Sequence, residues 1–237
     1  MSAPDDGGAL RAWIVGPGRM GRDIEREWTE RGHEVTATVD VEDEWPAENA
    51  GADVAFEFTR PEAAERNVER LLERGIPTVC GTTGWDPSAA RKEADRRGVP
   101  LLVSPNFSVG MMALRAALLA AARRISGVEG YDPGVFERHH RAKEDAPSGT
   151  AGLLADELEA VLGRRPEVAS LRQGEQPGVH HIFIEGPDEE IRLTHRARSR
   201  EPFVVGAVEA AEHLARERPA GDVRFADFLD AARSSDG

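Results

Sequence analysis

The segment at 137–151, ERHHRAKEDAPSGTA, brings together side chains that can exchange protons. Lys143 is one of two lysines among the 30 Lys and Arg residues of the chain. A lysine can donate a proton when its pKa falls, which an arginine does not do. Histidine titrates near neutral pH, so either His139 or His140 suits general acid catalysis. The segment therefore predicts a site of proton transfer.

Three small residues in the same segment, Ser148-Gly149-Thr150, precede a helix predicted from about Ser148 to Leu162. Their N–H groups and hydroxyls predict an anion pocket, because a helix N-terminus favours negative charge. The alternative is that Ser148 is a plain N-cap. Zinc is a rival at the His-His pair, but adjacent histidines without a supporting Cys lack the usual ligand spacing, so no metal site is predicted.

A second chemical motif, GPGRMG at 16–21, fits the pattern G-x-G-x-x-G between a predicted strand (11–15) and a predicted helix (20–31). That context predicts dinucleotide binding, because the glycines allow a tight turn and close backbone approach to a pyrophosphate at the helix N-terminus. The expected cofactor contacts in this loop are Gly16, Pro17, Gly18, Arg19, Met20 and Gly21.

Asp40 ends the next predicted strand (34–39) and lies 19 residues beyond Gly21. An acid at this spacing is expected to hydrogen-bond the adenosine ribose, the alternative being a solvated acid at a strand end. The following residues, Val41, Glu42 and Asp43, offer no cation for a 2′-phosphate. The sequence therefore favours NADH over NADPH as cofactor.

Two further turns follow predicted strands, at the edge where ligands bind in parallel sheets. They are expected to border the nicotinamide, although either can be an ordinary turn. Cys80, beside the first turn, is interpreted as a packed side chain and not as a nucleophile. The residues of the two turns are Gly81, Thr82, Thr83 and Gly84, and Ser104, Pro105, Asn106 and Phe107.

These motifs lie on two different patterns of predicted elements. Up to Ser108, strands (11–15, 34–39, 52–58, 78–80, 100–103) alternate with helices (20–31, 61–75, 87–97), which predicts a Rossmann-like, doubly wound parallel sheet. Capping-box spacing from Thr59 to Glu62 opens the second helix.

The later part of the chain is predicted as α+β with an antiparallel or mixed sheet, from helices (110–124, 148–162) and strands (134–137, 179–185, 191–197). Two more helices (203–216, 225–232) follow. The expected domains are 1–108 for dinucleotide binding, with 201–237 packing back onto it, and 109–200 for substrate binding and oligomerisation.

Bulk composition narrows the class of protein. A net charge of −13 disfavours nucleic acid and anionic membranes as partners. The most apolar stretch, Met111 to Ala122, is interrupted by Arg115 and is too short to span a bilayer. The single cysteine and an acidic N-terminus unlike a signal peptide lead us to expect a cytoplasmic protein.

A hydride cofactor, a carboxylate pocket and proton donors together predict reduction of a C=N or C=C bond in an acidic small molecule. At this point the chain resembles the 4-hydroxy-tetrahydrodipicolinate reductase (dihydrodipicolinate reductase) family of lysine and diaminopimelate biosynthesis. The resemblance runs from the glycine loop to the C-terminal helix. Besides the 137–151 segment, the motifs that carry it are 58–62 (FTRPE), 81–84 (GTTG), 106–110 (NFSVG), Thr194-His195, Ser199-Arg200 and Gly206-Ala207.

The resemblance implies roles for matching residues. It implies that His139 is the acid/base residue and that Lys143 donates a proton. It also implies that His140, Lys143, Gly149 and Thr150, with Ser148 beside them, hold the carboxylates of a small dicarboxylate substrate. The glycine loop, Asp40 and the turns at 81–83 and 104–107 would line the NADH or NADPH site. Family members are usually homotetramers assembled through the sheet of the second domain. The alternatives are a catalytically silent nucleotide-binding regulator and another amino-acid-pathway dehydrogenase of the same plan.

The chain departs from the family pattern in four places. The glycine loop is one residue shorter than usual, and Glu57 replaces an Asp before Phe58-Thr59. Ala142 stands where many members have a further His. The segment between Leu162 and Arg172 is short and lacks a Gly-rich stretch. The last departure bears on domain closure, substrate affinity and tetramer contacts, and it leaves His139 and Lys143 in place.

Overall fold

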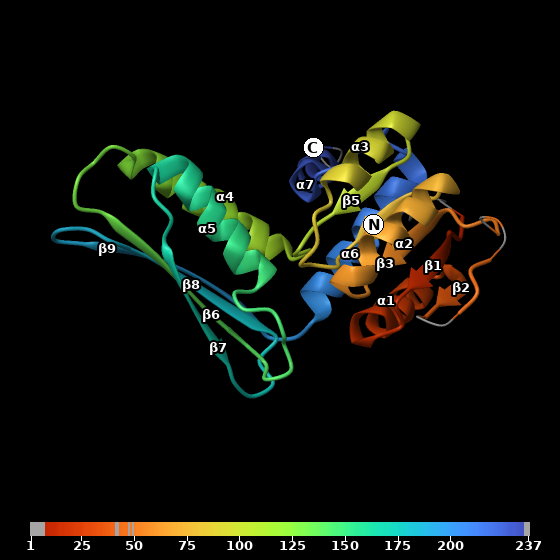
Figure 1. The fold of residues 1–237 in the computed structure, drawn as a ribbon, viewed down its shortest axis with the longest axis horizontal. Helices are drawn as coiled ribbons and strands as arrows, with labels where there is room; N and C mark the ends of the chain where they lie inside the picture. The colour runs from red at the N-terminus through yellow and green to blue at the C-terminus, as the bar shows by residue number, and fades with distance from the viewer. Residues whose placement is uncertain (1–7, 41–42, 47, 49, 235–237) are drawn as a thin grey trace, which may run out of the picture. The chain divides into compact units, whose positions relative to one another are not determined.

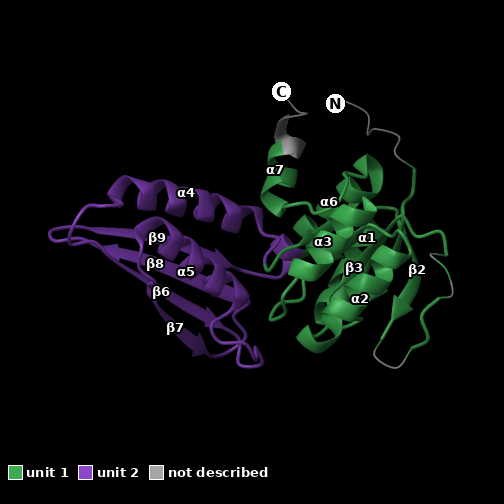
Figure 2. Cartoon of the chain, turned by 45° about the horizontal axis from the view of Figure 1, so that its top comes forward, with its two compact units in different colours: residues 1–105, 204–237 green, residues 106–203 purple. Residues whose placement is uncertain are grey.

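The computed structural model describes residues 8–40, 43–46, 48 and 50–234. The chain forms two compact units, which are coloured separately in Figure 2. Unit 1 comprises Met1–Pro105 and Val204–Gly237, and unit 2 comprises Asn106–Phe203. Each unit has its own sheet.

Unit 1 is built on a parallel sheet of five strands in the order β2-β1-β3-β4-β5 (Figure 1). The chain leaves β1 towards β2 on one side and later returns to β3 on the other, so the order reverses beside β1. The strands are β1 (Arg11–Val15), β2 (Glu34–Val39), β3 (Val54–Glu57), β4 (Thr78–Cys80) and β5 (Leu101–Val103). The helices between them are α1 (Arg19–Glu30), α2 (Pro61–Glu73) and α3 (Ser88–Arg97).

Helices cover both faces of this sheet. Trp28 of α1 meets Phe56 edge-on, with ring centroids 5.4 Å apart. Leu71 of α2 packs instead into a core cluster with Trp13 and Ala55. Adjacent residues of a strand point to opposite faces, so Ala55 and Phe56 place α2 and α1 on opposite sides. The predicted doubly wound sheet is confirmed.

Two further helices, α6 (Glu201–Glu217) and α7 (Phe225–Ser234), follow late in the chain. The segment between them joins the β5 edge of the unit 1 sheet: the Leu101 N–H donates to the Gly221 carbonyl at 2.9 Å, and the Val223 N–H donates to the Leu101 carbonyl at 2.8 Å. Among the described residues, we find no helix of the length and apolarity needed to cross a membrane.

Unit 2 has a mixed sheet of four strands in the order β7-β6-β8-β9. Two helices, α4 (Val109–Ile125) and α5 (Gly149–Leu162), cover one face (Figure 2). Their apolar side chains pack on Val135, Ile182 and Ile184 of the sheet. The strands are β6 (Asp132–His139), β7 (Glu167–Arg172), β8 (Gly178–Glu185) and β9 (Glu190–Ala197). Since β6 pairs parallel with β7 and antiparallel with β8, the sheet is mixed, as one of the two expected forms.

Two local predictions are wrong, and one strand was missed. Strand β6 continues to His139, beyond the predicted end at Glu137, because it pairs with β7 along its whole later half. Strand β7 itself was not predicted: it alternates weakly and most of its residues are exposed. The capping box at Thr59 does not form, because the Thr59 hydroxyl donates to the Glu57 carboxylate and α2 begins at Pro61 without a side-chain cap.

Candidate active site

The glycine loop connects β1 to α1 in unit 1. Gly16 has a φ of 93°, and a Cβ at this position would come within 2.4 Å of the Phe58 carbonyl oxygen. A Cβ at Gly21 would come within 2.2 Å of the Gly16 oxygen. Both glycines are therefore required by close backbone packing. At Gly18, the N-cap of α1, a Cβ would meet nothing within 4 Å, and no side chain caps the helix. The first N–H groups of α1 are thus open to an anion.

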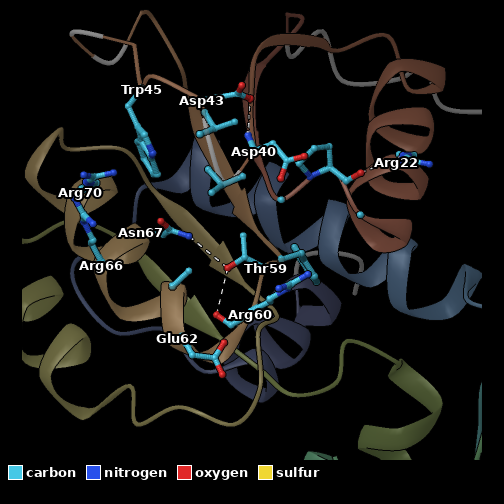
Figure 3. A pocket seen from close by; sticks show the side chains of 17 residues that line it. Arg22, Asp40, Asp43, Trp45, Thr59, Arg60, Glu62, Arg66, Asn67 and Arg70 are labelled. Carbon is cyan, nitrogen blue, oxygen red and sulfur yellow. Dashed lines mark hydrogen bonds between the residues drawn. The ribbon is translucent and has the colours of Figure 1, made fainter. Parts of the chain in front are cut away.

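A cavity of about 670 Å³ adjoins this loop (Figure 3). It lies at the carboxyl ends of β1 and β3, where the strand order reverses and where nucleotides bind in such sheets. Its volume is that of an ordinary small-molecule site. Of the predicted cofactor residues, Gly16, Pro17, Gly18 and Asp40 line it. The Asp40 N–H donates to the Asp43 carboxylate at 2.7 Å, which shapes the turn after β2.

The remaining predicted cofactor residues lie elsewhere. Arg19, Met20 and Gly21 form the first turn of α1. Gly81, Thr82, Thr83, Ser104 and Pro105 are not among the described residues that line the cavity. Asn106 and Phe107 belong to unit 2, where the Asn106 amide donates to the Thr150 hydroxyl at 3.1 Å. Cys80 is fully buried, as interpreted from the sequence, and burial raises the pKa of its thiol.

Basic side chains that sequence reasoning missed also line the cavity. Arg66 and Arg70 stand one turn apart on α2, and Arg22 comes from α1 (Figure 3). The Arg70 guanidinium lies 5.2 Å from the centroid of the Trp45 ring, which lines the cavity too. The spacing of four residues from Arg66 to Arg70 was a usable signal, because it places both on one face of a helix.

His139 is the buried last residue of β6 in unit 2. Its Nδ1 is hydrogen-bonded to the Glu137 carboxylate, and its ring meets His180 edge-on with centroids 5.2 Å apart. A Cβ at Gly178 would come within 2.9 Å of the His139 Nε2, so only a glycine leaves this nitrogen its space. With Nδ1–H donating to the carboxylate, Nε2 is the nitrogen left for proton exchange.

Glu137 is fully buried, and sequence reasoning did not assign it a role. Arg172 of β7 pairs with it through two bonds, at 2.7 and 2.9 Å, and the Ser148 N–H donates to it at 3.3 Å. Burial would raise the pKa of Glu137, but hydrogen bonds from His139, Arg172 and Ser170 lower it well below its usual range. Glu137 is therefore ionised. Its place two residues before His139 was a signal, because i and i+2 share a strand face.

His180 of β8 completes the buried group. Its Nε2 lies 3.3 Å from the Ser148 hydroxyl. Burial first, and then the positive charge of His139, lowers the pKa of His180 to about 3. His180 is therefore neutral near neutral pH.

Lys143 lies in the loop between β6 and α5, where its Nζ is 2.6 Å from the Asp145 carboxylate. The same carboxylate accepts the Gly149 N–H at 3.3 Å. Asp145 thus contacts two groups that were predicted to hold a substrate carboxylate, and sequence reasoning missed it. His140 lies half-buried at the start of this loop. Its backbone carbonyl oxygen accepts a hydrogen bond from the backbone N–H of Lys143 at 3.2 Å.

The start of α5 agrees with the N-cap alternative. The Ser148 hydroxyl accepts the Ala151 N–H at 3.3 Å, and Thr150 is held by Asn106. The structure thus brings His139, Lys143, Ser148, Gly149 and Thr150 into unit 2 around Glu137 and Asp145. Among the described residues, no three His, Cys, Asp or Glu side chains are grouped as a metal would need.

Sequence comparisons place the chain among known proteins. The N-terminal profile of dihydrodipicolinate reductase matches residues 10–107, and the C-terminal profile matches residues 110–229. A 4-hydroxy-tetrahydrodipicolinate reductase of Anaeromyxobacter sp. (strain Fw109-5) is 39% identical over 212 residues, covering 81% of this chain and 78% of the relative. The enzyme of that name from Natronomonas pharaonis is 37% identical, covering 91% of this chain and 98% of the relative.

A solved structure has the same fold. Dipicolinate-bound dihydrodipicolinate reductase from Paenisporosarcina sp. TG-14 matches with a TM-score of 0.71 at 20% identity, covering 92% of this chain and 98% of that one. At this identity the likeness concerns the fold alone. The profiles carry the assignment, since together they span almost the whole chain and both sets of motifs. The chain belongs to the dihydrodipicolinate reductase family.

Proposed function

We propose that this chain reduces 4-hydroxy-tetrahydrodipicolinate to tetrahydrodipicolinate in lysine and diaminopimelate biosynthesis. Family membership and the names of the relatives support this activity. The single observation that carries the chemistry is the pairing of His139 with the buried carboxylate of Glu137. A catalytically silent nucleotide-binding regulator would not require a histidine with a buried, charged partner.

In the proposed reaction His139 exchanges a proton with the substrate through Nε2. The ionised Glu137 fixes the orientation of the ring and stabilises the imidazolium form. Arg172 keeps Glu137 ionised and in place through its two bonds. Neutral His180 packs against His139 without adding a second positive charge.

We propose that Lys143, His140 and the start of α5 bind the substrate carboxylates, with Lys143 also supplying a proton. Ser148, Gly149 and Thr150 offer hydroxyls and N–H groups at a helix N-terminus, which favours anions. Asp145 now contacts Lys143 and the Gly149 N–H. A substrate carboxylate therefore has to share or replace these contacts when it binds.

We propose that unit 1 holds the nicotinamide cofactor, which supplies hydride when bound. The residues fit this group: a Cβ-free turn at Gly16 and Gly18, the uncapped α1 N-terminus and an adjoining cavity of about 670 Å³. The glycine loop would hold the pyrophosphate and Asp40 the ribose. Thr82, Thr83 and the turn at 104–107 remain predicted contacts of the nicotinamide.

We keep NADH as the favoured cofactor, with NADPH as the alternative. Asp40 and Asp43 both line the cavity, and a carboxylate beside the ribose repels a 2′-phosphate. Arg66 and Arg70 line the same cavity and give NADPH a specific argument, since guanidinium groups bind phosphate well. Comparing kcat/KM for the two cofactors decides the point, and a value for NADPH equal to or above that for NADH would reverse the preference.

We further propose a homotetramer in the cytoplasm, without nucleic-acid or membrane partners. The face of the unit 2 sheet away from α4 and α5 carries Phe136, His181 and Phe183, whose rings lie within 6.0 Å of their neighbours. Leu171, which β7 exposes on this side, has 40% of its surface accessible. An open face with stacked rings and an exposed leucine favours burial against further copies.

The test follows NADH oxidation with freshly generated 4-hydroxy-tetrahydrodipicolinate. His139→Gln and Lys143→Ala are each expected to lower kcat about 100-fold or more, because positioned proton donors contribute factors of this order. NADH binding should be unchanged in both variants. Lys92→Ala, which removes the only other lysine at an exposed position of α3, is the matched control and should keep full activity.

The outcomes separate the alternatives. An inactive wild-type protein that still binds NADH favours the silent regulator, while full activity in the His139 and Lys143 variants overturns the site assignment. Activity on another amino-acid precursor, without activity on this substrate, favours a different dehydrogenase of the same plan.

A further inference from the structure

Glu57, the last residue of β3, is as fully buried as Glu137 but has a different environment. Whereas Glu137 pairs with Arg172, Glu57 has only uncharged hydrogen-bond partners among the residues that the structure describes. The Asn67 amide donates at 3.1 Å, the Cys80 thiol at 3.2 Å and the Thr82 hydroxyl at 2.6 Å, and the Thr59 hydroxyl donates as well.

The four donors are shared equally between the two carboxylate oxygens. Thr59 and Asn67 bind Oε1, and Cys80 and Thr82 bind Oε2. This is the arrangement of an ionised carboxylate, which can only accept. Burial raises the pKa of the Cys80 thiol, with the charge of Glu57 adding to the effect, so Cys80 stays protonated as a donor. A buried carboxylate without a cation is unfavourable unless its hydrogen bonds are complete, as they are here.

Of the four donors, Cys80 is the last residue of β4, and the other three come from three segments outside the strands. Thr59 belongs to the loop after β3, Asn67 to α2 and Thr82 to the turn after β4. Thr59 and Asn67 both line the cavity (Figure 3). The two loops are also joined directly, because the Thr59 N–H donates to the Thr82 hydroxyl at 2.8 Å. The Thr82 hydroxyl in turn donates to Glu57, so the carboxylate anchors both.

The glycine loop rests on the same structure. A Cβ at Gly16 would come within 2.4 Å of the Phe58 oxygen and 2.7 Å of the Thr59 side chain, so the loop is packed directly on these two residues. The Phe58 ring in turn fills the space over Gly81, where a Cβ would come within 2.0 Å of it. A shift of Phe58 and Thr59 would therefore move the pyrophosphate loop and the turn after β4 together.

We propose that Glu57 is a positioning residue for the dinucleotide, which holds the loops after β1, β3 and β4 in their binding geometry through its four hydrogen bonds. This inference rests on the proposed cofactor role of unit 1. Glu57 is not among the described residues that line the cavity, so it acts through Thr59, Asn67 and Thr82. Its removal should therefore weaken cofactor binding more than it slows turnover at saturating cofactor.

The test measures the Kd of NADH by its fluorescence, together with kcat and KM, in full-length variants. Glu57→Gln replaces one of the two acceptor oxygens by an NH2 group, so a single oxygen remains for donors that bind two oxygens in the wild-type protein. The substitution is expected to raise the Kd and KM for NADH about tenfold, which corresponds to the loss of roughly one charge-assisted hydrogen bond. The kcat at saturating NADH should change less than about threefold. Glu57→Asp keeps the charge and both acceptor oxygens, and should restore most of the affinity.

Glu212→Gln is the matched control for a merely structural effect. Glu212 is also mostly buried in unit 1, where it binds His33 at 2.9 Å and Arg31 at 3.1 Å, but it is not among the described residues lining the cavity. The Glu212→Gln substitution should lower the melting temperature and leave the Kd of NADH unchanged. An unchanged Kd in Glu57→Gln, or an equal rise in Glu212→Gln, overturns the inference. Failure of the wild-type protein to bind either NADH or NADPH would instead overturn the proposed cofactor role.

Discussion

At the scale of single residues, the two buried carboxylates of Glu137 and Glu57 have different partners and different proposed roles. Glu137 is paired with Arg172 and His139, so its charge is available to stabilise a protonated imidazole. Among the described residues, Glu57 is bonded only to uncharged donors, and its proposed role is to hold the loops from which three of these donors come. The proposed role of each carboxylate therefore follows from the groups that bind it.

His180 gives a pH-dependent prediction at this scale. Its pKa is about 3 in the folded protein, mainly because of burial, against about 6.5 for an exposed histidine. As pH falls below 6.5 the unfolded chain binds a proton that the folded chain does not, so the free energy of unfolding should fall by up to about 1.4 kcal/mol per pH unit. His180→Asn should flatten this slope between pH 6.5 and 5.

Urea unfolding at pH 7, 6 and 5 measures the effect. Glu137 does not obscure the effect of His180 on this slope. Its pKa is lowered in the folded protein, so it contributes stability that is present above about pH 4.5 and is lost only as the pH falls further. Equal slopes for wild type and His180→Asn would contradict the assignment of His180 as a buried neutral base.

At the scale of elements, two helices of unit 2 begin in the same way. Ser108 caps α4 by accepting the Met111 N–H, and Ser148 caps α5 by accepting the Ala151 N–H, both at 3.3 Å. Loss of either hydroxyl removes one capping bond. Each hydroxyl also lies 3.3 Å from the Nε2 of a histidine, His195 for Ser108 and His180 for Ser148. Only Ser148 has a predicted substrate contact.

Ser148→Ala and Ser108→Ala should therefore differ in activity and agree in stability. Each is expected to lower the free energy of unfolding by about 1 kcal/mol, as loss of an N-cap does. Ser148→Ala should in addition raise the KM for substrate about tenfold, since a substrate carboxylate loses a hydroxyl donor. Urea unfolding and steady-state kinetics check both parts. Equal KM values in the two variants would reduce Ser148 to a helix cap.

Element boundaries also explain two errors of sequence reasoning. The β6 strand extends through Glu137 to His139 because β7 pairs with it, and β7 has no clear alternation of its own. The pairing of β6 with β8 ends at Arg138, and only β7 pairs with His139 itself. The expected capping box at Thr59 failed because a buried carboxylate two residues earlier competes for the same hydroxyl.

At the scale of the whole molecule, the proposed tetramer depends on the open face of the unit 2 sheet. Leu171 on this face and Val128 in the turn before β6 are the large apolar side chains that the described residues expose most, at 40% and 54%. Leu171→Glu is expected to break the assembly, because a charge would be buried in each interface. Val128→Glu adds the same charge away from the sheet.

Light scattering measures the outcome. The wild-type protein should have four times the chain mass of 25.8 kDa, Val128→Glu the same mass and Leu171→Glu a smaller one. Normal mass in Leu171→Glu, or loss of assembly in both variants, would argue against assembly through this face.

The sequence by itself determined the features that depend on neighbouring residues. The glycine turn between strand and helix, the alternating elements of unit 1, and the His139, Lys143 and Ser148–Thr150 segment are all local patterns, in which backbone conformation and side-chain chemistry are set within a few residues. These patterns sufficed for the fold class and for singling out Lys143 and the His139-His140 pair, whereas the choice of His139 over His140 came from the resemblance to the family.

Only the tertiary structure decided what burial and distant partners impose. Arg172 reaches Glu137 across 35 residues, and Arg66 and Arg70 enter the cavity from a helix well beyond Asp40. The contacts of Glu57 with Cys80 and Thr82 depend on strands β3 and β4 lying side by side. The charge and pKa of a buried group depend on how completely the group is desolvated and on which groups contact it. Both depend on which strands lie side by side, and this cannot be read from the order of residues.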